Sequence, residues 1–361
     1  MERRYNRRAL SLRCSCVAAL AFAALAWGQS ASRVTLASVP AEAQARMHEA
    51  IEEIRSVPRS TAEYDYIMTA RVRLLLFWAG KDDVGGGYIR RGMSMENQPS
   101  EFFQIVMGSD PAKAPRAINR WGAASERVLF ARQGSEAQSS TFFGFMKVYK
   151  GNSPDEMRKE LDGEKGSGQY LFSAILNQAD ADSTSAKTVP FTSNTDYNIH
   201  QMDAAEPVVF DQLQNTQGKF RLLDPEQYHA CGRPEGFLSS VAELVDSALD
   251  GRATPEALCY VYNGQLFRLT LTHVAPVEHE SVRVSLDGAS QPYTRDYSDL
   301  RLARFDNYNE TMRQGSSFEL LLGTKGNLRG VPVRISYQPN WWFQVVLNLK
   351  TPEETKTAEL R

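Results

Sequence analysis

The chain has 361 residues, of which 42% are hydrophobic, 23% charged and 10% aromatic, a composition typical of a globular protein with enough apolar material for a sizeable core. Its formal charge of −2 argues against a nucleic-acid partner, because phosphate binding requires clustered lysine and arginine side chains. The length is typical of about two domains.

The first thirty residues have the pattern of a secretory signal peptide. Five arginines precede residue 14, the apolar run CVAALAFAALAW follows, and small residues stand at cleavage spacing in 24–26 and 30–32. The apolar run is shorter than the ~20 residues of a membrane-spanning helix. We therefore expect residues 1–30 to be removed. The mature chain, which has no long apolar stretch, is expected to be periplasmic or extracellular and to lack a transmembrane span.

The leader also bears on the export route. The stretch 6-NRRALSLR-13 resembles a twin-arginine signal, although ordinary signal peptides are arginine-rich as well. A lipidated cysteine would follow the apolar run, whereas Cys14 and Cys16 lie at its start. Removal of residues 1–30, which hold five arginines and one glutamate, changes the formal charge from −2 to −6.

The mature chain keeps two cysteines, Cys231 and Cys259. In an oxidising compartment two such residues are more often paired than reduced, so we predict a disulfide between them. The pair brackets a helical pattern at 234–250, and the bond would contribute about 3 kcal/mol, mainly by restricting the unfolded chain. Two buried, reduced thiols are the alternative.

In chain order, the first predicted element of the mature chain is a helix over 41–56, within an N-terminal helical segment at 31–60. Apolar residues such as Met47 and Ile54 recur there at helical spacing, and Pro58 follows.

Strand-like runs come next, each rich in β-branched and aromatic residues and separated from the next by Gly, Ser and Pro clusters. The predicted strands are 64–80, 87–95, 102–108, 127–132, 142–149 and 169–176. A helix at 154–162 interrupts them, because Ser153 and Glu156 form a capping box. The polar segment 177–188 is predicted to be an exposed loop.

The last third has the clearest periodicity. An amphipathic helix is predicted at 234–250, with Gly251 at its end. Alternating strands are predicted at 265–274, 331–338 and 341–349, with hairpin turns at Asn263-Gly264 and Pro339-Asn340. One face of these strands is apolar and the other mostly polar, as in an antiparallel sheet packed on one side.

These elements predict a mainly β (β-rich α+β) fold. We expect antiparallel sheets in two β units, as a sandwich or a curved sheet, with a few peripheral helices. The predicted domains are a β-rich region at 61–228 and a region at 229–350 that combines the helix with the C-terminal strands. Residues 351–361 are expected to form a tail.

The stretch 81-KDDVGGG-87 is the first candidate site. Asp82 and Asp83 could bind Ca²⁺ or act as an acid–base pair, but neither the spacing of a calcium loop nor that of a phosphate-binding loop is present. Asp and Gly supply the positive φ angles of a hairpin loop. We therefore interpret the stretch as a turn that joins 64–79 to 87–93.

Other catalytic motifs are missing from the sequence. The five histidines, His48, His200, His229, His273 and His279, form no H-E-x-x-H motif and no usual zinc spacing. Neither G-x-S-x-G nor Ser-x-x-Lys occurs. We predict no cofactor and no metal site.

Two aromatic or cationic features are candidates for ligand binding. Arg116, Arg120 and Trp121, together with Asp110 and Lys113, could form a cationic, aromatic-lined patch, or could belong to a Pro-bounded loop with paired arginines. In 341-WWFQ-344, Trp342 lies out of phase with the apolar face, so it could stack on a sugar or an acyl chain. Core packing is the alternative.

Four stretches carry a resemblance to a known family. WAGKDDVGGGYIRRG, GSDPAKAPRAINRWG, YNGQLFRLTL and PVRISYQPNWWFQVVLNL resemble blocks of a family of exported bacterial proteins that has no assigned function. The resemblance spans most of the mature chain and implies no activity, cofactor or catalytic residue.

Three functions are compatible with these observations. The leading hypothesis is a non-catalytic envelope protein that binds a lipid-like ligand or a partner protein at a pocket between or within curved sheets. An alternative is an extracytoplasmic hydrolase of glycans or esters, in which Asp82, Asp83 or Asp110 would converge with a histidine or an arginine. The third is a structural subunit of an envelope assembly.

Overall fold

The structure is a computed structural model. It describes residues 62–74, 77–94, 100–110, 113–114, 119–129, 139–149, 171–180, 187–194, 221–222, 236–252, 254, 256–262, 265–310 and 312–350. The signal peptide, the helices predicted at 41–56 and 154–162, Cys231 and the tail at 351–361 lie outside these residues.

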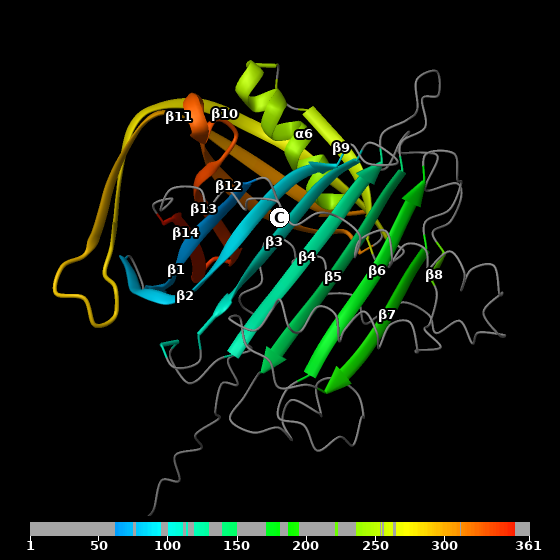
Figure 1. Ribbon diagram of the computed structural model, residues 1–361, viewed down its shortest axis with the longest axis horizontal. Helices are drawn as coiled ribbons and strands as arrows, with labels where there is room; N and C mark the ends of the chain where they lie inside the picture. Colours follow the sequence, from blue (N-terminus) through cyan, green and yellow to red (C-terminus); the bar gives the residue numbers. More distant parts are fainter. Residues whose placement is uncertain are drawn as a thin grey trace, which may run out of the picture.

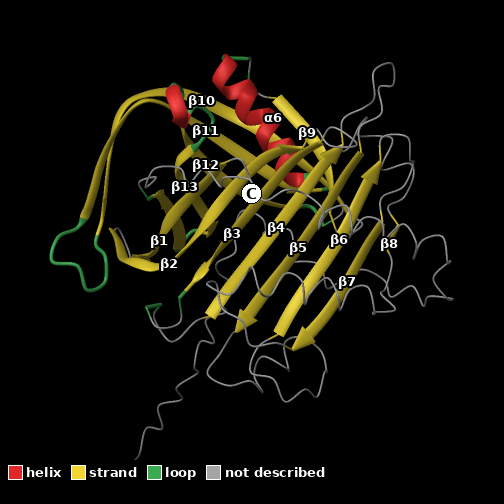
Figure 2. Ribbon diagram, viewed as in Figure 1, coloured by secondary structure: helices red, strands yellow, loops and turns green. Residues whose placement is uncertain are grey.

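The described residues form strands and one α-helix (Figure 2). The strands are β1 (Ala62–Leu74), β2 (Phe77–Ser94), β3 (Ser100–Ser109), β4 (Asn119–Leu129), β5 (Ser139–Tyr149), β6 (Leu171–Asp180), β7 (Lys187–Asn194), β8 (Arg221–Leu222), β9 (Glu256–Tyr262), β10 (Gln265–Val284), β11 (Tyr293–Asn309), β12 (Gln314–Gly323), β13 (Pro332–Asn340) and β14 (Phe343–Leu349). The helix is α6 (Phe237–Asp250), and a 3-10 turn, η3, covers Gly326–Leu328. The mainly β prediction is confirmed.

All of these strands belong to one sheet, in which β1 pairs with β14 and every paired neighbour is antiparallel. The order is β8-β7-β6-β5-β4-β3-β2-β1-β14-β13-β12-β11-β10-β9. We call β1–β8 the N-terminal limb and β9–β14 the C-terminal limb. The two predicted β regions therefore share a sheet, and the hydrogen bonds between β1 and β14 join them.

The sheet curls until its two limbs face each other (Figure 1). The ring of Phe142 in β5 lies 5.4 Å from the ring of Tyr262 in β9, edge to face, although nine strands lie between β5 and β9 in the sheet order. Such a contact requires strong curvature, because neighbouring strands are spaced by about 4.8 Å. The inner face of the curl is the core of the protein.

The helix α6 lies between the limbs and contacts β3 and β4 of one and β9, β10 and β11 of the other. Its sequence explains this position, because Phe237, Leu244, Val245 and Ala248 recur at helical spacing and are all buried. The helix predicted at 234–250 is confirmed, and Gly251 ends it in the left-handed conformation with φ 72°.

A buried carboxylate from the sheet caps the amino end of α6. Glu126 of β4 accepts hydrogen bonds from the backbone N–H groups of Leu238 (2.7 Å) and Ser239 (3.2 Å) and from the hydroxyls of Ser239 (2.6 Å) and Ser140 (2.7 Å). A helix has free N–H groups at this end and a partial positive charge, so a carboxylate is stabilising there. A Cβ at Gly236 would overlap the Glu126 carboxylate, which explains the glycine.

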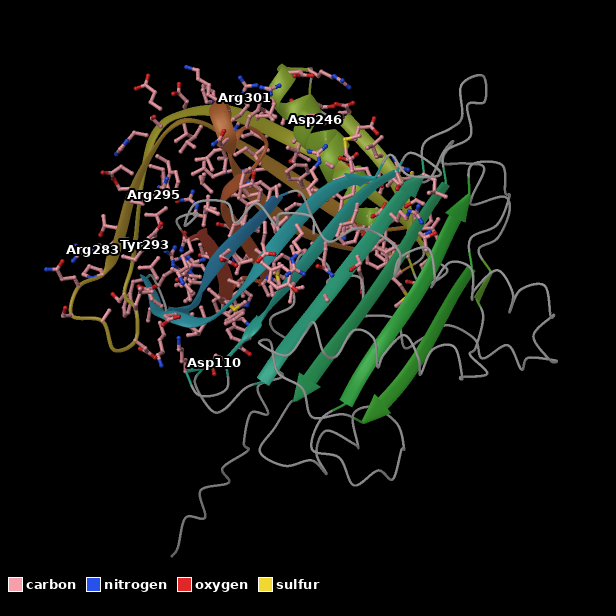
Figure 3. The ribbon with its side chains drawn as sticks, viewed as in Figure 1. Asp110, Asp246, Arg283, Tyr293, Arg295 and Arg301 are labelled. Carbon is pink, nitrogen blue, oxygen red and sulfur yellow. The ribbon has the colours of Figure 1, made fainter. Side chains whose placement is uncertain are left out.

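An arginine from the opposite limb binds the carboxyl end of the same helix. Arg301 of β11 donates from Nη1 to the carbonyl oxygens of Ala248 and Leu249, both at 2.6 Å, and Figure 3 places it beside α6. A cation is favourable at this end of a helix dipole. The helix is therefore held across the curl by one charged side chain from each limb.

The interpretation of 81–87 as a turn is wrong. The chain reverses between Leu74 and Phe77, and the whole KDDVGGG stretch lies inside β2. Met68 pairs with Gly85 and Ala70 with Lys81, so the single residue between them in β1 faces three residues of β2. The stretch is thus a β-bulge, in which Asp83 has a positive φ of 51°.

The three glycines after the bulge permit close approach of neighbouring strands. A Cβ at Gly85 would overlap the carbonyl oxygen of Gly108, and a Cβ at Gly87 would overlap that of Val106, both in β3. Gly85 and Gly87 are therefore required by strand spacing and not by a turn.

The turn predicted at Pro339-Asn340 is also displaced. Both residues belong to β13, Asn340 pairs with Phe343, and the reversal is at Trp341 and Trp342. The predicted phase of the two tryptophans is reversed as well: Trp341 is 68% exposed, whereas Trp342 is partly buried against the core. By contrast, the break between β9 and β10 falls at residues 263–264, as predicted.

Candidate functional site

Three neighbouring strands place a cluster of polar side chains on the inner face of the C-terminal limb. Gln265 pairs with Tyr262, Phe267 pairs with both Tyr260 and Asn309, and Leu269 pairs with Asn307. Cross-strand partners point to the same face of a sheet, and residues two apart in a strand share that face. The polar members, which we call the polar cluster, are all at most 7% exposed: Tyr260, Tyr262, Gln265, Asn307 and Asn309.

Hydrogen bonds pair some of the polar groups of the polar cluster with each other and with the neighbouring backbone. The hydroxyl of Tyr260 donates to Oδ1 of Asn307 at 2.9 Å. The Nδ2 of Asn309 donates to Oε1 of Gln265 at 2.8 Å, and the Oδ1 of Asn309 accepts from the backbone N–H of Met312 at 2.8 Å. These bonds orient both amides, so the Nε2 group of Gln265 is turned away from Asn309.

Two buried groups of the polar cluster have no hydrogen-bond partner among the residues that the structure describes: the Tyr262 hydroxyl and Nε2 of Gln265. They come from directly paired residues on either side of a two-residue turn, so their side chains are neighbours. An unpartnered buried donor costs about 1–3 kcal/mol, and such groups are few in folded proteins. The other two unpartnered buried atoms in the described part are Ser247 Oγ, in α6, and Glu256 Oε2, at the opposite end of β9 from Tyr262.

Aromatic rings pack against the two tyrosines of the polar cluster. Tyr262 packs edge-on against Phe142 of β5 and against Phe267, which stacks on Tyr260 at 5.0 Å. Phe237, the first residue of α6, lies 5.2 Å from the Tyr260 ring. Burial raises the pKa of both tyrosines well above the ordinary value, so their hydroxyls stay protonated and can donate.

The chemistry of the two unpartnered groups suits a ligand oxygen that accepts hydrogen bonds. The Nε2 group of Gln265 can only donate, whereas the Tyr262 hydroxyl can donate and accept. A carboxylate, ester, phosphate or hydroxyl oxygen within hydrogen-bonding distance would supply the missing partner in a buried, low-dielectric setting, where a hydrogen bond is strong. The rest of such a ligand would contact aromatic rings.

The acidic residues predicted as alternative catalytic groups lie elsewhere, on the bulge of β2. Asp82 accepts from Thr69 Oγ1 (2.9 Å) and from the backbone N–H of Ser285 (2.9 Å). Asp83 accepts from Nζ of Lys113 (2.9 Å) and from the backbone N–H of Asp287 (3.1 Å). Both carboxylates thereby hold the loop between β10 and β11.

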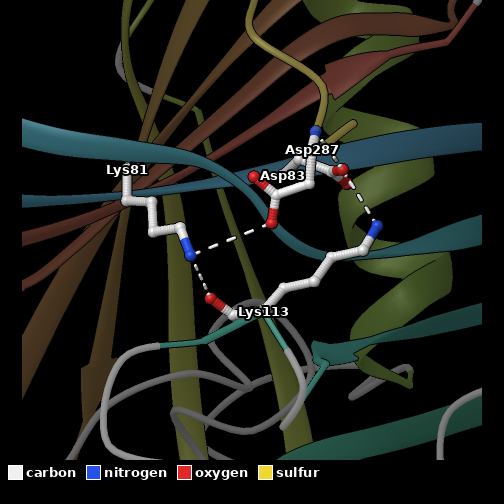
Figure 4. Close-up of polar contacts among 4 residues, drawn as sticks. All are labelled: Lys81, Asp83, Lys113 and Asp287. Atoms are coloured by element: carbon white, nitrogen blue, oxygen red, sulfur yellow. Dashed lines mark hydrogen bonds and ion pairs between the residues drawn. The ribbon is translucent and has the colours of Figure 1, made fainter. Parts of the chain in front are cut away.

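Two lysines complete this contact, which we call the loop clasp (Figure 4). Nζ of Lys81 donates to the backbone oxygen of Lys113 at 2.5 Å and lies 3.9 Å from Asp287. The bond with Asp83 raises the pKa of Lys113. Asp110 lies close enough to contribute to that rise, and its backbone N–H donates to the carbonyl oxygen of Val84 at 2.8 Å.

The arginine and tryptophan side chains of the cationic, aromatic patch predicted at 108–122 lie outside the described part of the structure. Arg116 lies outside the described residues, and Arg120 and Trp121 are described only as backbone positions of β4, paired with Val148 and Lys147. Trp342 packs against Phe343 with ring centroids 5.8 Å apart. Ligand binding by these four residues stays a prediction.

The described residues include one of the two cysteines of the predicted disulfide and two of the five histidines. Cys259 lies in β9 and is disulfide-bonded, but Cys231 lies outside the described residues, so the pairing of these two cysteines stays a prediction.

His273 and His279 lie in β10, and His279 is 3.1 Å from Ser281 Oγ. Within the described segments, no group of three His, Cys, Asp or Glu side chains could hold a metal ion. No helix among them is long and apolar enough to cross a membrane.

Comparison with known proteins finds structural matches but no sequence match. No protein-family model matches the chain, and no curated protein matches its sequence. The structure matches the crystal structure of a beta-barrel-like protein of the domain of unknown function DUF1849 from Brucella abortus, with a TM-score of 0.40 and 10% identity, over 82% of this chain and 98% of the other. The match assigns no activity to either protein.

Proposed function

We propose that the protein is a non-catalytic binding protein, acting outside the cytoplasm, that holds a lipid-like ligand inside its curled sheet. The observation that carries the proposal is the presence, on two residues paired across β9 and β10, of buried groups without a partner among the described residues: the Tyr262 hydroxyl and Nε2 of Gln265. A ligand oxygen would recover the free energy that folding loses by burying them. The export leader of the sequence supports the location.

The chemistry around the pair favours an amphiphile over a fully polar ligand. The Tyr262 ring packs against Phe142 and Phe267, Phe267 stacks on Tyr260, and α6 contacts β9 and β10. A sugar or free phosphate would leave its other oxygens buried without donors, which is costly. A molecule with one polar end and an apolar remainder would satisfy the donors and bury the rest against the rings.

The hydrolase alternative has less support from the described residues. It requires Asp82, Asp83 or Asp110 to meet a histidine or an arginine. The carboxylates of Asp82 and Asp83 instead accept bonds from backbone amides of the β10–β11 loop and from Lys113. These contacts fix a loop, so we assign the two acids a structural role.

Native mass spectrometry of the exported protein, purified from its own envelope, tests the proposal. We expect an adduct of lipid mass on the wild type. We also expect it to be lost from Tyr262→Phe, which removes only the unpartnered hydroxyl. The same loss is expected from Gln265→Met, which removes the unpartnered Nε2 together with the oxygen that accepts from Asn309. Tyr260→Phe is the matched control, because the Tyr260 hydroxyl already has a partner in Asn307.

The outcomes separate the alternatives. An adduct that survives both Tyr262→Phe and Gln265→Met would place the ligand elsewhere and refute the site. A wild type without any adduct would remove the support for a lipid-like ligand. Loss of the adduct from Tyr260→Phe as well would mean that packing, and not the two donors, holds the ligand.

A further inference from the structure

Large hydrophobic side chains are exposed at two adjoining hairpin ends. At the end of the β1–β2 hairpin, Val72 is 36%, Phe77 62% and Trp78 40% exposed. At the β13–β14 turn, Trp341 is 68% exposed. We call these four residues the aromatic tip. Exposed tryptophan and phenylalanine at the ends of hairpins are unfavourable in water and point to an interaction site.

Backbone pairing joins the two hairpin ends. Val72 of β1 pairs with Phe343 of β14, and the backbone N–H of Arg73 donates to the carbonyl oxygen of Trp342 at 2.7 Å. In β2, Trp78 pairs with Arg73, whereas Phe77 pairs with Leu74. Since neighbouring residues in a strand point to opposite faces, Phe77 and Trp78 present rings on both sides of the hairpin end.

The charged residues beside the aromatic tip are cationic, whereas the chain as a whole has a formal charge of −2. Arg71 and Arg73 are exposed, and neither has an ion-pair partner among the residues described. The sequence holds no Asp or Glu from 66 to 81 and none from 331 to 350. Positive charge is therefore concentrated where the apolar rings are exposed.

We propose that the aromatic tip docks the protein on an anionic bilayer surface. Tryptophan and phenylalanine rings partition into the interface between headgroups and acyl chains, and nearby arginines bind anionic lipid headgroups. A projecting end with rings on both sides suits insertion between lipids better than it suits a flat protein surface. The proposal is independent of the ligand site, because the aromatic tip and the polar cluster share no residue.

Vesicle co-sedimentation of the exported protein tests this. The vesicles contain equal parts of phosphatidylglycerol and phosphatidylcholine, or phosphatidylcholine alone. We expect the wild type to sediment with the anionic vesicles and to be released by high salt. The triple change Phe77→Ser, Trp78→Ser, Trp341→Ser is expected to lower the partition coefficient about tenfold or more. The double change Arg71→Gln, Arg73→Gln should lower it about fivefold per arginine.

Met93→Ser is the matched control. Met93 lies in the same strand, outside the aromatic tip, and is 57% exposed, so its loss should leave the partition coefficient unchanged. Circular dichroism checks that each variant folds, and Trp341→Ser alone serves if the triple variant does not. Absence of wild-type binding to anionic vesicles, or equal binding by the variants of the aromatic tip, would overturn the proposal. Tip-dependent capture of a protein instead of vesicles would overturn it as well.

Discussion

Two buried polar sites lie beside Phe142, one in each limb of the curled sheet. Glu126 pairs with Phe142 in the N-terminal limb and accepts hydrogen bonds from two backbone amides and two hydroxyls. Tyr262 packs edge-on against the same ring, and its hydroxyl has no hydrogen-bond partner among the described residues. Both sites are buried, but the hydrogen-bonding groups of the Glu126 site are paired and the Tyr262 hydroxyl is not. We therefore interpret the first site as an anchor of the fold and the second as a place for a ligand.

The largest expected effect comes from removing the satisfied anchor. Glu126→Ala leaves the amides of Leu238 and Ser239 and the hydroxyls of Ser239 and Ser140 without their acceptor. We expect the free energy of unfolding to fall by at least about 3 kcal/mol. Urea denaturation measures it.

Glu63→Ala is the control for that change, since Glu63 is an exposed carboxylate paired with Arg90. Its loss should cost at most about 1 kcal/mol. A similar small loss for Glu126→Ala would show that its four donors find other partners, and the contrast between the two sites would fail.

At the Tyr262 site, removal of the polar group should not lower the free energy of unfolding. The two tyrosines of the polar cluster test this expectation. Tyr260→Phe leaves Asn307 Oδ1 without its donor, so we expect a loss of about 1–2 kcal/mol. Tyr262→Phe removes a hydroxyl that has no partner, so the ligand-free protein should keep or gain stability. Thermal and urea unfolding of both variants give the comparison, and a larger loss for Tyr262→Phe would contradict it.

The stability of the protein should also depend on the protonation of Glu126. Burial raises the pKa of Glu126 above its ordinary value of 4.5, although bonds from Ser239, Ser140 and Leu238 lower it in part. A carboxyl whose folded pKa is raised contributes stability below the unfolded pKa, and this contribution is lost as the pH rises through the folded pKa. Relative to Glu126→Gln, the wild type should therefore lose stability over that window. Urea titrations across the pH series check the sign, and a wild-type advantage that grows with pH would reverse it.

Part of this architecture could be predicted from local patterns. The helix α6 has a periodic apolar stripe and an end glycine, and the break at 263–264 follows an Asn-Gly pair. The turn prediction at 81–87 failed because three glycines also permit close strand approach, which depends on β3. Likewise, the two tryptophans of 341–342 form the turn themselves, so strand alternation misplaced both.

The sites were harder to predict than the elements. Glu126 lies 112 residues before Leu238 in sequence, and no local signal marks it as a helix cap. The Asn263-Gly264 turn brings Tyr262 opposite Gln265, but their burial depends on Phe142, which belongs to the other limb. Only the curl of the sheet reveals the site, and curvature is a sum of small twists and bulges that local sequence does not determine.

The smallest effect concerns the loop clasp, where the polar groups are partly exposed. Lys113→Met removes the bond to Asp83, whose partner lysine is 36% exposed, so we expect at most about 0.5 kcal/mol of global stability to be lost. Lys325→Met is the control, because Lys325 pairs with Asp299 in another exposed ion pair. Global unfolding should not distinguish the two variants.

Hydrogen exchange should distinguish them. The Asp287 amide donates to the same Asp83 oxygen that binds Lys113, so its exchange is expected to accelerate in Lys113→Met and not in Lys325→Met. Such a result would mean that the bulge of β2 acts locally, by holding the β10–β11 loop, whereas Glu126 acts on the whole fold. Equal exchange in both variants would mean that backbone contacts alone hold the loop, and that the charged pair adds nothing to them.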